Sequence, residues 1–287
     1  MFEVVMSDSS RTADDARAAF QSCKSRDPKD QVQFYDSWAE NYEEVSPKKL
    51  VLFRFCFNIF IHLCSSVRLF WVLVLVLNRF SISSQDHTLM SYRAPDLAVN
   101  FLSDHFSGNP EDALVLDVAC GSGWVARVMV KLGFRLFVGV DGSKGMLEQA
   151  AQTGLYQDLK LALLGPEPLP APPDTFDVVI MVGALDDGFA PVSVVRELCN
   201  AAKPGGLVCM ARGDHRATSS HRYKKDLERE LQLMEEDGLW SLVRVQHVHR
   251  YMEDPHVTQE EQEEQEERYI TGNIYLYRKS SRAAVHS

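Results

Sequence analysis

The stretch Val115-Leu116-Asp117-Val118-Ala119-Cys120-Gly121-Ser122-Gly123 decides the fold of this chain of 287 residues. It is an apolar run that ends in a glycine-rich segment, and residues 125–131 after it have the pattern of a helix. Ligands of open sheets with parallel strands bind outside the carboxyl ends of those strands. The turn that contains the two glycines is therefore a candidate binding loop.

Short apolar runs and helical segments alternate on both sides of this turn. The predicted strands are residues 113–119, 136–140, 159–164, 176–185 and 207–211, and the predicted helices are residues 92–106, 125–131, 192–202 and 223–237. Such alternation is typical of a parallel sheet covered by helices on both faces. Two more strands, near 242–249 and 273–277, have no helix between them and predict a final antiparallel hairpin. The acidic run at 260–267 is expected to be a solvated loop.

Two carboxylates lie at the ends of the first two predicted strands. Asp117 lies just inside the first strand end, where it suits a cationic group of a ligand. Asp141 ends the second strand, where a carboxylate can accept both hydroxyls of a ribose. Gly121 and Gly123 let the backbone approach a ligand closely. Ser143 is predicted to cap the next helix. This combination is more specific than a glycine-rich loop alone.

A dinucleotide is the competing ligand, because residues 121–126 also match the G-x-G-x-x-G/A fingerprint. A dinucleotide places its pyrophosphate on a helix N-terminus. Asp117 would repel that phosphate charge, and the bulky Trp124 stands where the chain should be slim. An NAD-binding oxidoreductase stays open as an alternative.

The composition excludes several classes of protein. A net charge of -10, from 30 Lys+Arg and 40 Asp+Glu, disfavours a nucleic-acid partner. The 45% of hydrophobic and 24% of charged residues exclude wholesale disorder. The 6 cysteines have no metal-ligand spacing, so we expect reduced thiols and no metal site. We expect no signal peptide and a cytoplasmic protein, with the nucleus as the alternative location.

Residues 50–77 are far more apolar than their flanks, but Arg54, Asn58, His62 and Arg68 interrupt the run. A membrane-spanning helix needs about 18 or more predominantly apolar residues, and each arginine at its centre costs roughly 2.5–3.5 kcal/mol. We therefore expect an apolar insert rather than a membrane helix, and no membrane partner.

Several motifs together resemble the class I S-adenosylmethionine-dependent methyltransferases. They are Asp117–Gly123, Val140–Ser143, Phe176–Ile180 and the turn Lys203–Gly206. The phrases Phe34–Ala39, Tyr92–Pro95 and Gly142–Gln149 resemble one group within that superfamily, the methyltransferase-like protein 27 group. The resemblance runs from about residue 33 to residue 279, apart from the apolar insert.

The resemblance implies an α/β, Rossmann-like fold. Its sheet has seven mostly parallel strands, with strand seven antiparallel beside strand five and an N-terminal helical cap. The expected organisation is a cap at 1–46, the apolar insert at 47–85, an S-adenosylmethionine-binding domain at 86–279 and a disordered tail at 280–287. We hypothesise that the insert is a gene-model artefact, because its composition is foreign to the cap that it interrupts. If all sequenced transcripts include the insert, this hypothesis is wrong.

The resemblance also implies S-adenosyl-L-methionine as the cofactor. The residues carried over as cofactor-binding are Tyr35, Arg93, Asp117, Ala119, Cys120, Gly121, Gly123, Asp141, Gly142, Met146, Leu164 and Val182. Asp117 and the glycine backbone would hold the methionine part, Asp141 the ribose, and Gly142 and Met146 the adenine. An acidic residue normally follows the third strand, but this chain has Leu164-Gly165-Pro166-Glu167 there, so Leu164 is expected to cover the ring instead.

The expected function is methyl transfer to an acceptor that the sequence does not identify. We favour a small molecule over a protein acceptor, and a monomer. A non-catalytic protein that binds S-adenosylmethionine or S-adenosylhomocysteine is the alternative. The catalytic residues stay undetermined: Asp186 and Asp187 are candidate bases, although a solvated turn is the plainer interpretation, and His215 and His221 are weaker candidates.

Overall fold

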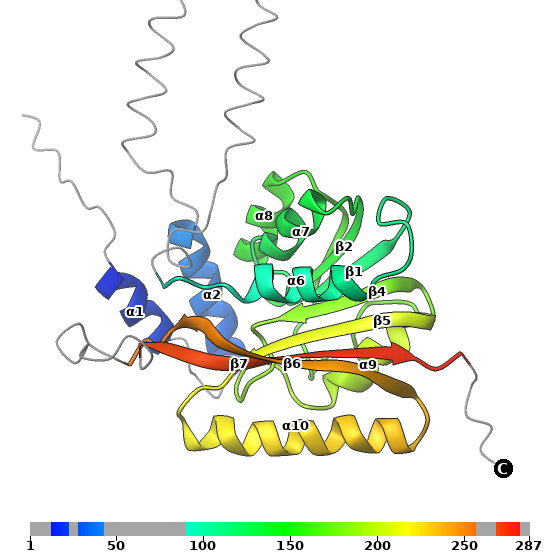
Figure 1. Ribbon diagram of the computed structural model, residues 1–287. Coiled ribbons are helices and arrows are strands. Elements are labelled where there is room, and N and C mark those ends of the chain that lie inside the picture. The colour runs from blue at the N-terminus through cyan, green and yellow to red at the C-terminus, as the bar shows by residue number, and fades with distance from the viewer. Residues whose placement is uncertain (1–12, 23–27, 43–89, 257–267, 282–287) are drawn as a thin grey trace, which may run out of the picture.

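The computed structural model describes residues 13–22, 28–42, 90–256 and 268–281 of the chain (Figure 1). The predicted apolar insert at 47–85, the acidic run at 260–267 and most of the predicted tail lie outside the described residues. Among the helices that are described, none is long and apolar enough to cross a membrane.

A seven-stranded sheet in the order β3-β2-β1-β4-β5-β7-β6 forms the centre of the molecule. Its strands are β1 (Leu114–Val118), β2 (Leu136–Asp141), β3 (Tyr156–Leu161), β4 (Phe176–Val182), β5 (Ala202–Gly213), β6 (Trp240–Glu253) and β7 (Tyr269–Lys279). The strands from β3 to β5 pair in parallel, whereas β7 is antiparallel to both β5 and β6. The predicted Rossmann-like sheet with its antiparallel terminal hairpin is confirmed.

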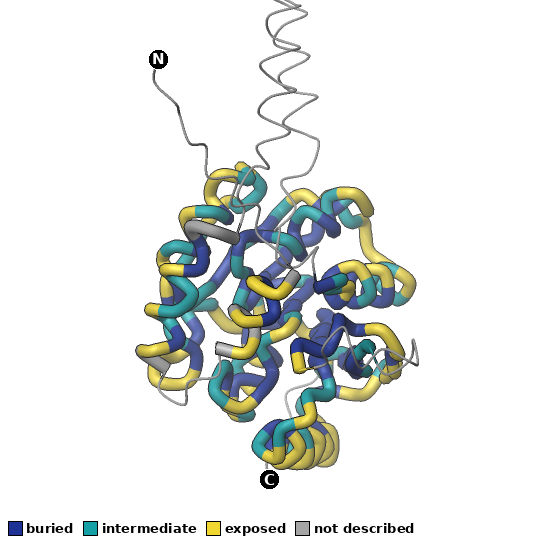
Figure 2. The backbone as a smooth tube through the Cα atoms, turned by 90° about the vertical axis from the view of Figure 1, so that its left-hand side faces the viewer, coloured by how far each residue is buried: buried dark blue, intermediate teal, exposed yellow. Residues whose placement is uncertain are grey.

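Helices cover both faces of the sheet. The described helices are α1 (Ala13–Ser22), α2 (Pro28–Tyr42), α6 (Ala94–His105), α7 (Trp124–Lys131), α8 (Lys144–Gln152), α9 (Val194–Ala201) and α10 (Thr218–Glu236). Apolar side chains of α6 and α7 form one buried cluster with the sheet, and those of α9 and α10 form a second cluster. Figure 2 shows buried backbone through the centre of the molecule and exposed residues on the outer turns of helices.

The central strand β4 shows how the sequence divides between these two clusters. Val178 and Ile180 pack with α6 and α7, while Val179 and Met181 pack with α9 and α10. Successive side chains of a strand point to opposite faces, so a strand covered on both faces must be apolar throughout. This is the physical reason for the apolar run at 178–182 within the predicted strand.

Several predicted strand boundaries are wrong. The fifth strand, predicted at 207–211, is Ala202–Gly213 and includes the predicted turn Lys203–Gly206. The third strand is Tyr156–Leu161 rather than 159–164, because β3 is an edge strand that pairs only with β2 and therefore carries polar residues. Leu161, in the apolar run that suggested the later start, is 57% exposed. The fourth strand ends at Val182 rather than 185, because Gly183 takes a φ of +81° that turns the chain out of the strand.

Candidate active site

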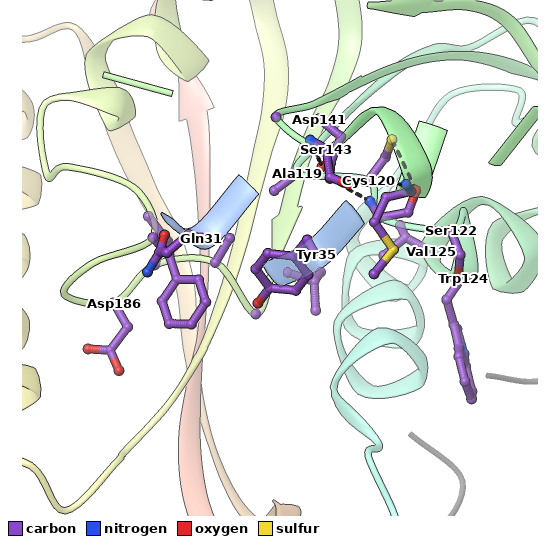
Figure 3. A pocket seen from close by; sticks show the side chains of 18 of the residues that line it. Gln31, Tyr35, Ala119, Cys120, Ser122, Trp124, Val125, Asp141, Ser143 and Asp186 are labelled. Carbon is purple, nitrogen blue, oxygen red and sulfur yellow. Dashed lines mark hydrogen bonds between the residues drawn. The ribbon is translucent and has the colours of Figure 1, made fainter. Parts of the chain in front are cut away.

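A pocket opens at the carboxyl ends of β1, β2, β4 and β5. Its walls come from the glycine-rich turn after β1, the start of α8, the segment after β4 and the cap helix α2. Figure 3 shows Ala119, Cys120 and Ser122 on one side of this pocket and Asp186 on the other, with Tyr35 between them. We call the side around the glycine-rich turn the donor side and the side around Asp186 the acceptor side.

The glycine-rich turn is held open by its backbone geometry and by Asp141. Gly121 has a φ of +52° and Gly123 a φ of +89°, both in the left-handed region that favours glycine. The Asp141 carboxylate accepts hydrogen bonds from the backbone N–H of Gly121 at 2.8 Å and of Ser143 at 2.9 Å. Burial raises the pKa of Asp141, and these backbone N–H groups oppose that rise. The turn therefore faces the pocket in a fixed shape.

Asp117 lies directly behind this turn, with 1% of its surface exposed. The Tyr156 hydroxyl donates a hydrogen bond of 2.7 Å to one oxygen of the Asp117 carboxylate. The other oxygen, Oδ1, is buried and has no hydrogen-bond partner among the described residues. Burial raises the pKa of Asp117 to about 7, the Tyr156 hydrogen bond opposes the rise, and the charge of Asp141 adds to it. An unpartnered buried carboxylate oxygen fits a cationic group of a ligand.

The cap helix α2 is fastened across the donor side by Asp36. One oxygen of its carboxylate accepts hydrogen bonds from Ser143 Oγ at 2.6 Å and from the backbone N–H of Gly145 at 2.9 Å. A Cβ atom on Gly145 would lie 2.9 Å from Cβ of Ala39, so glycine permits this close approach of α2 and α8. The predicted Ser143 cap of α8 is confirmed, since Ser143 Oγ accepts from the backbone N–H of Met146.

A buried charged cluster forms the acceptor side. Arg212, 2% exposed, lies 3.6 Å from Asp186 and 3.1 Å from Asp214. Nε2 of His215 lies 3.9 Å from the second oxygen of Asp186. Asp186, Arg212 and His215 all line the pocket. The predicted candidate His221 lies instead on the exposed side of α10.

Two tyrosines complete the acceptor side. The rings of Tyr92 and Tyr251 meet edge to face, with centroids 5.8 Å apart. A Cβ atom on Gly183 would lie 2.2 Å from the Tyr92 hydroxyl, so only a glycine at the end of β4 leaves room for that hydroxyl. Burial raises the pKa of Tyr92 to about 12, so its hydroxyl keeps its proton near neutral pH.

The structure brings most of the residues predicted for the cofactor into this one pocket. Those that line it are Tyr35, Ala119, Cys120, Gly121, Asp141, Gly142, Met146, Leu164 and Val182. Asp117 and Gly123 do not line the pocket: Asp117 accepts a hydrogen bond from Tyr156, and a Cβ atom on Gly123 would lie 3.0 Å from the same tyrosine ring. Arg93 is not brought to the pocket: it precedes α6, its side chain is exposed, and its backbone N–H donates to Tyr251. Trp38 of α2 is buried against Met146.

Sequence reasoning missed several residues of the site. Tyr156 escaped notice because the apolar pattern placed the third strand three residues later. Asp36 stood inside a quoted motif, but nothing in the sequence indicated that it reaches α8. Arg212 lies at the end of a predicted strand, and its link to Asp186 comes from parallel strands whose carboxyl ends meet at one edge.

Comparison with known proteins identifies the domain. Residues 116–210 match the family model described as a methyltransferase domain, a span that begins in β1 and ends in β5. The match includes the glycine-rich turn, Asp141 and Asp186. This part of the chain is similar to a methyltransferase domain. It resembles the class I S-adenosylmethionine-dependent methyltransferases in particular, as the motifs predicted.

Individual proteins that are similar to this chain also have methyltransferase names. The human "Methyltransferase-like protein 27" is 51% identical over 156 residues, which cover 54% of this chain and 62% of that protein. The "Ubiquinone biosynthesis O-methyltransferase" of Parvibaculum lavamentivorans is 29% identical over 129 residues, covering 43% of this chain and 50% of that protein. The "tRNA U34 carboxymethyltransferase" of Cellvibrio japonicus is 34% identical over 106 residues, covering 35% and 32%. The chain thus spans less than two thirds of each relative.

The residues present fit the cofactor that the domain implies, S-adenosyl-L-methionine. Its α-amino group is a cation whose charge suits the Asp117 carboxylate behind the turn, one oxygen of which has no hydrogen-bond partner among the described residues. The position of a Cβ atom on Gly121 has no neighbouring atom within 4 Å, so the turn leaves open space on its pocket side. A carboxylate oxygen can accept more than one hydrogen bond, so Asp141 can bind ribose hydroxyls while it holds the turn.

Proposed function

We propose that this protein transfers a methyl group from S-adenosyl-L-methionine to a small-molecule acceptor. The observation that carries the proposal is the pair of carboxylates beside one open glycine-rich turn: the half-buried Asp141, which lines the pocket, and the buried Asp117 behind it. A pyrophosphate would lie beside two negative charges there, whereas a ligand with an amino cation and a ribose finds a partner for each group. The proposal therefore favours this donor over a dinucleotide.

The chain's own residues would hold each part of the donor. Asp117 would pair with the amino group and Asp141 with the ribose hydroxyls. Met146 and Leu164, both buried and lining the pocket, would pack against the adenine ring. Asp36 would keep α2, with its Tyr35, closed over that part of the pocket. The donor would then have one orientation, with its reactive end toward the acceptor side.

Positioning is the main work that the protein does in such a reaction. The bound cofactor supplies a methyl group on a sulfonium leaving group that needs no further activation. Gly183 and Val182 at the end of β4 lie between the donor side and the acceptor side, where the two reactants would meet. Holding two reactants in the correct geometry lowers the barrier by up to roughly 7–11 kcal/mol in favourable models.

A small acceptor is favoured over a folded protein or a nucleic acid by the depth of the acceptor side. Asp186 is 5% exposed and Arg212 is 2% exposed, so an acceptor must enter the molecule to reach them. The cap helix α2 covers part of the entrance with Gln31, Val32 and Tyr35. Pockets that bury most of a ligand are typical of small-molecule sites.

Calorimetry tests the donor assignment. The full chain is titrated with S-adenosylmethionine, S-adenosylhomocysteine and NADH. Binding of the first two and not of NADH is the expected result; binding of NADH alone would overturn the proposal. Incubation with methyl-labelled donor and a metabolite extract then tests turnover. Label in small molecules supports methyl transfer to a small-molecule acceptor. Label only in protein would indicate a protein acceptor instead. No label despite donor binding favours the non-catalytic alternative.

A further inference from the structure

We infer that His215, beside the Asp186 carboxylate, accepts the proton of a neutral hydroxyl group on a flat aromatic acceptor. The inference rests on the proposed function and adds to it a base and an acceptor class. Both residues line the pocket on the side opposite the glycine-rich turn, as Figure 3 shows for Asp186. His215 is a catalytic residue in this account, and Asp186 is the residue that positions it.

The first support is the arrangement of Asp186 between its neighbours. One carboxylate oxygen of Asp186 accepts a hydrogen bond from the backbone N–H of Asp187 at 2.9 Å and lies 3.6 Å from Arg212. The other oxygen lies 3.9 Å from Nε2 of His215. Asp186 is therefore fixed on one side and turned toward the imidazole on the other. At this distance there is no direct hydrogen bond, but the charge of the carboxylate stabilises the protonated form of the imidazole.

The second support is the accessibility of His215. Its side chain is 22% exposed, against 7% for that of Asp186 and 2% for that of Arg212. It follows β5 by two residues, so it stands at the rim of the sheet where the pocket opens. A group that exchanges protons with an incoming molecule must reach both that molecule and water. His215 is the member of the cluster that can do so.

The third support is the charge of the cluster, which selects a neutral acceptor. The cations Arg212 and Lys224 contact the carboxylates of Asp186 and Asp214, so the charges balance. Each nitrogen of the Arg212 guanidinium already donates a hydrogen bond, to Leu185 O, to Asp214 and to Ser220. An anionic acceptor would therefore have to compete with these partners for the guanidinium, and a cationic acceptor would compete with Arg212 for Asp186.

The fourth support is the shape of the walls. Tyr35 and Phe189 stand with ring centroids 6.3 Å apart, and Tyr92 and Tyr251 meet edge to face at 5.8 Å. All four side chains line the pocket. Aromatic walls bind flat rings through offset and edge-to-face contacts. A phenol is the neutral, proton-bearing nucleophile that matches both the walls and the charge.

Methyl transfer to the hydroxyl oxygen moves one proton to His215. The acceptor hydroxyl gives its proton to a nitrogen of the neutral His215 imidazole, and its oxygen forms the new bond to the methyl carbon. The bond between that carbon and the donor sulfur breaks, and its electron pair stays on sulfur. The products are a methyl ether, a neutral thioether and an imidazolium beside the Asp186 carboxylate. Solvent then takes the proton from His215.

The test uses the full chain, methyl-labelled S-adenosylmethionine and three probes: catechol, phenylethylamine and benzoate. We expect label on catechol and not on the other two. The His215→Gln variant should lower kcat by about 100-fold or more, the range that general-base catalysis covers. Asp186→Asn should lower kcat by about tenfold and change KM for catechol little, because Asp186 acts on the reaction through His215 and not by binding the acceptor. His249→Gln, on the exposed face of β6, is the matched control.

Chemical rescue separates a base from a structural residue. Added imidazole should raise the activity of the His215→Ala variant by at least about tenfold. If His215 served packing alone, imidazole would not change the activity of the variant. S-adenosylhomocysteine affinity should stay within about twofold of the unmodified chain in every variant. Four results would each overturn the inference. They are label on the amine or the carboxylate probe, label on none of the three probes, an unchanged kcat in His215→Gln, and no rescue of His215→Ala by imidazole. Failure of the chain to bind S-adenosylhomocysteine would instead contradict the proposed function.

Discussion

The two sides of the pocket are built in different ways. The donor side comes from a nearly continuous segment, β1 through the start of α8, with Asp117 and Asp141 at successive strand ends. The acceptor side gathers Tyr92, Asp186, Arg212 and Tyr251 from segments far apart in the chain. A binding loop formed by neighbouring residues leaves a readable sequence motif, whereas a cluster assembled by the fold does not. The donor chemistry was therefore predictable and the acceptor chemistry was not.

The largest effect is expected from Asp141→Asn on the donor side. The substitution keeps the shape of Asp141 but removes its charge and half of its accepting capacity. Hydrogen bonds to charged groups contribute about 1.5–3 kcal/mol, so S-adenosylhomocysteine affinity should fall by roughly 10- to 100-fold in calorimetry. Asp158→Asn, at an exposed carboxylate on β3, is the matched control. Equal affinity of both variants for S-adenosylhomocysteine would show that Asp141 does not bind the ribose.

The next effect belongs to the acceptor side. Gly183→Ala places a Cβ atom 2.2 Å from the Tyr92 hydroxyl at a φ of +81°. The strained backbone and the displaced tyrosine should lower the free energy of unfolding by about 1–3 kcal/mol. Methyl transfer should fall further than S-adenosylhomocysteine affinity, which denaturant unfolding and calorimetry measure separately. The reverse order, with affinity lost and transfer kept, would show that Gly183 belongs to the donor side.

The pH dependence of donor binding should follow Asp117. Its pKa of about 7 means that the ionised form, which pairs with the amino cation, becomes populated as the pH rises. S-adenosylhomocysteine affinity should therefore rise by at least about tenfold between pH 5.5 and pH 7.5. Asp117→Asn should flatten that profile. A steep profile in the variant would assign the titration to another group, such as Asp141.

The raised pKa of Asp117 also makes the stability of the fold depend on pH. The folded-state pKa of Asp117 is raised from the usual 3.8 to about 7, so the folded chain binds the proton more tightly than the unfolded chain. The resulting stabilisation is fully present below about pH 4 and is lost as the pH rises through 7. Unfolding of the unliganded chain in urea should show this loss, and Asp117→Asn should not. A gain in stability over that window, relative to the variant, would contradict the assignment.

The smallest effect is expected where α2 is fastened to α8. Asp36→Ala removes two hydrogen bonds, from Ser143 Oγ and from the backbone N–H of Gly145. Such contacts contribute about 1 kcal/mol each to stability. Amide exchange in α2 should become faster, while the exchange of the central strands stays the same. Unchanged exchange in α2 would mean that Trp38 and Ala39, rather than Asp36, hold the cap.

Much of the fold followed from local patterns, because strands buried on two faces must be apolar and helices need caps. The run at Phe176 and the cap at Ser143 are examples. The edge strand β3 was placed three residues late, because a half-exposed strand loses that signal. Arg93 was assigned to the donor by resemblance, but its side chain is exposed. The cluster of Asp186 and Arg212 depends on which strands are neighbours, and only the folded sheet determines that.

A crystal structure of the full chain with S-adenosylhomocysteine tests the central claim most directly. The account predicts the ribose hydroxyls within hydrogen-bond distance of Asp141 and the amino group beside Oδ1 of Asp117. The sulfur atom should face Gly183 and the acceptor side that holds Asp186 and His215. An S-adenosylhomocysteine molecule bound elsewhere, or bound here with its sulfur turned away from that side, would contradict the account.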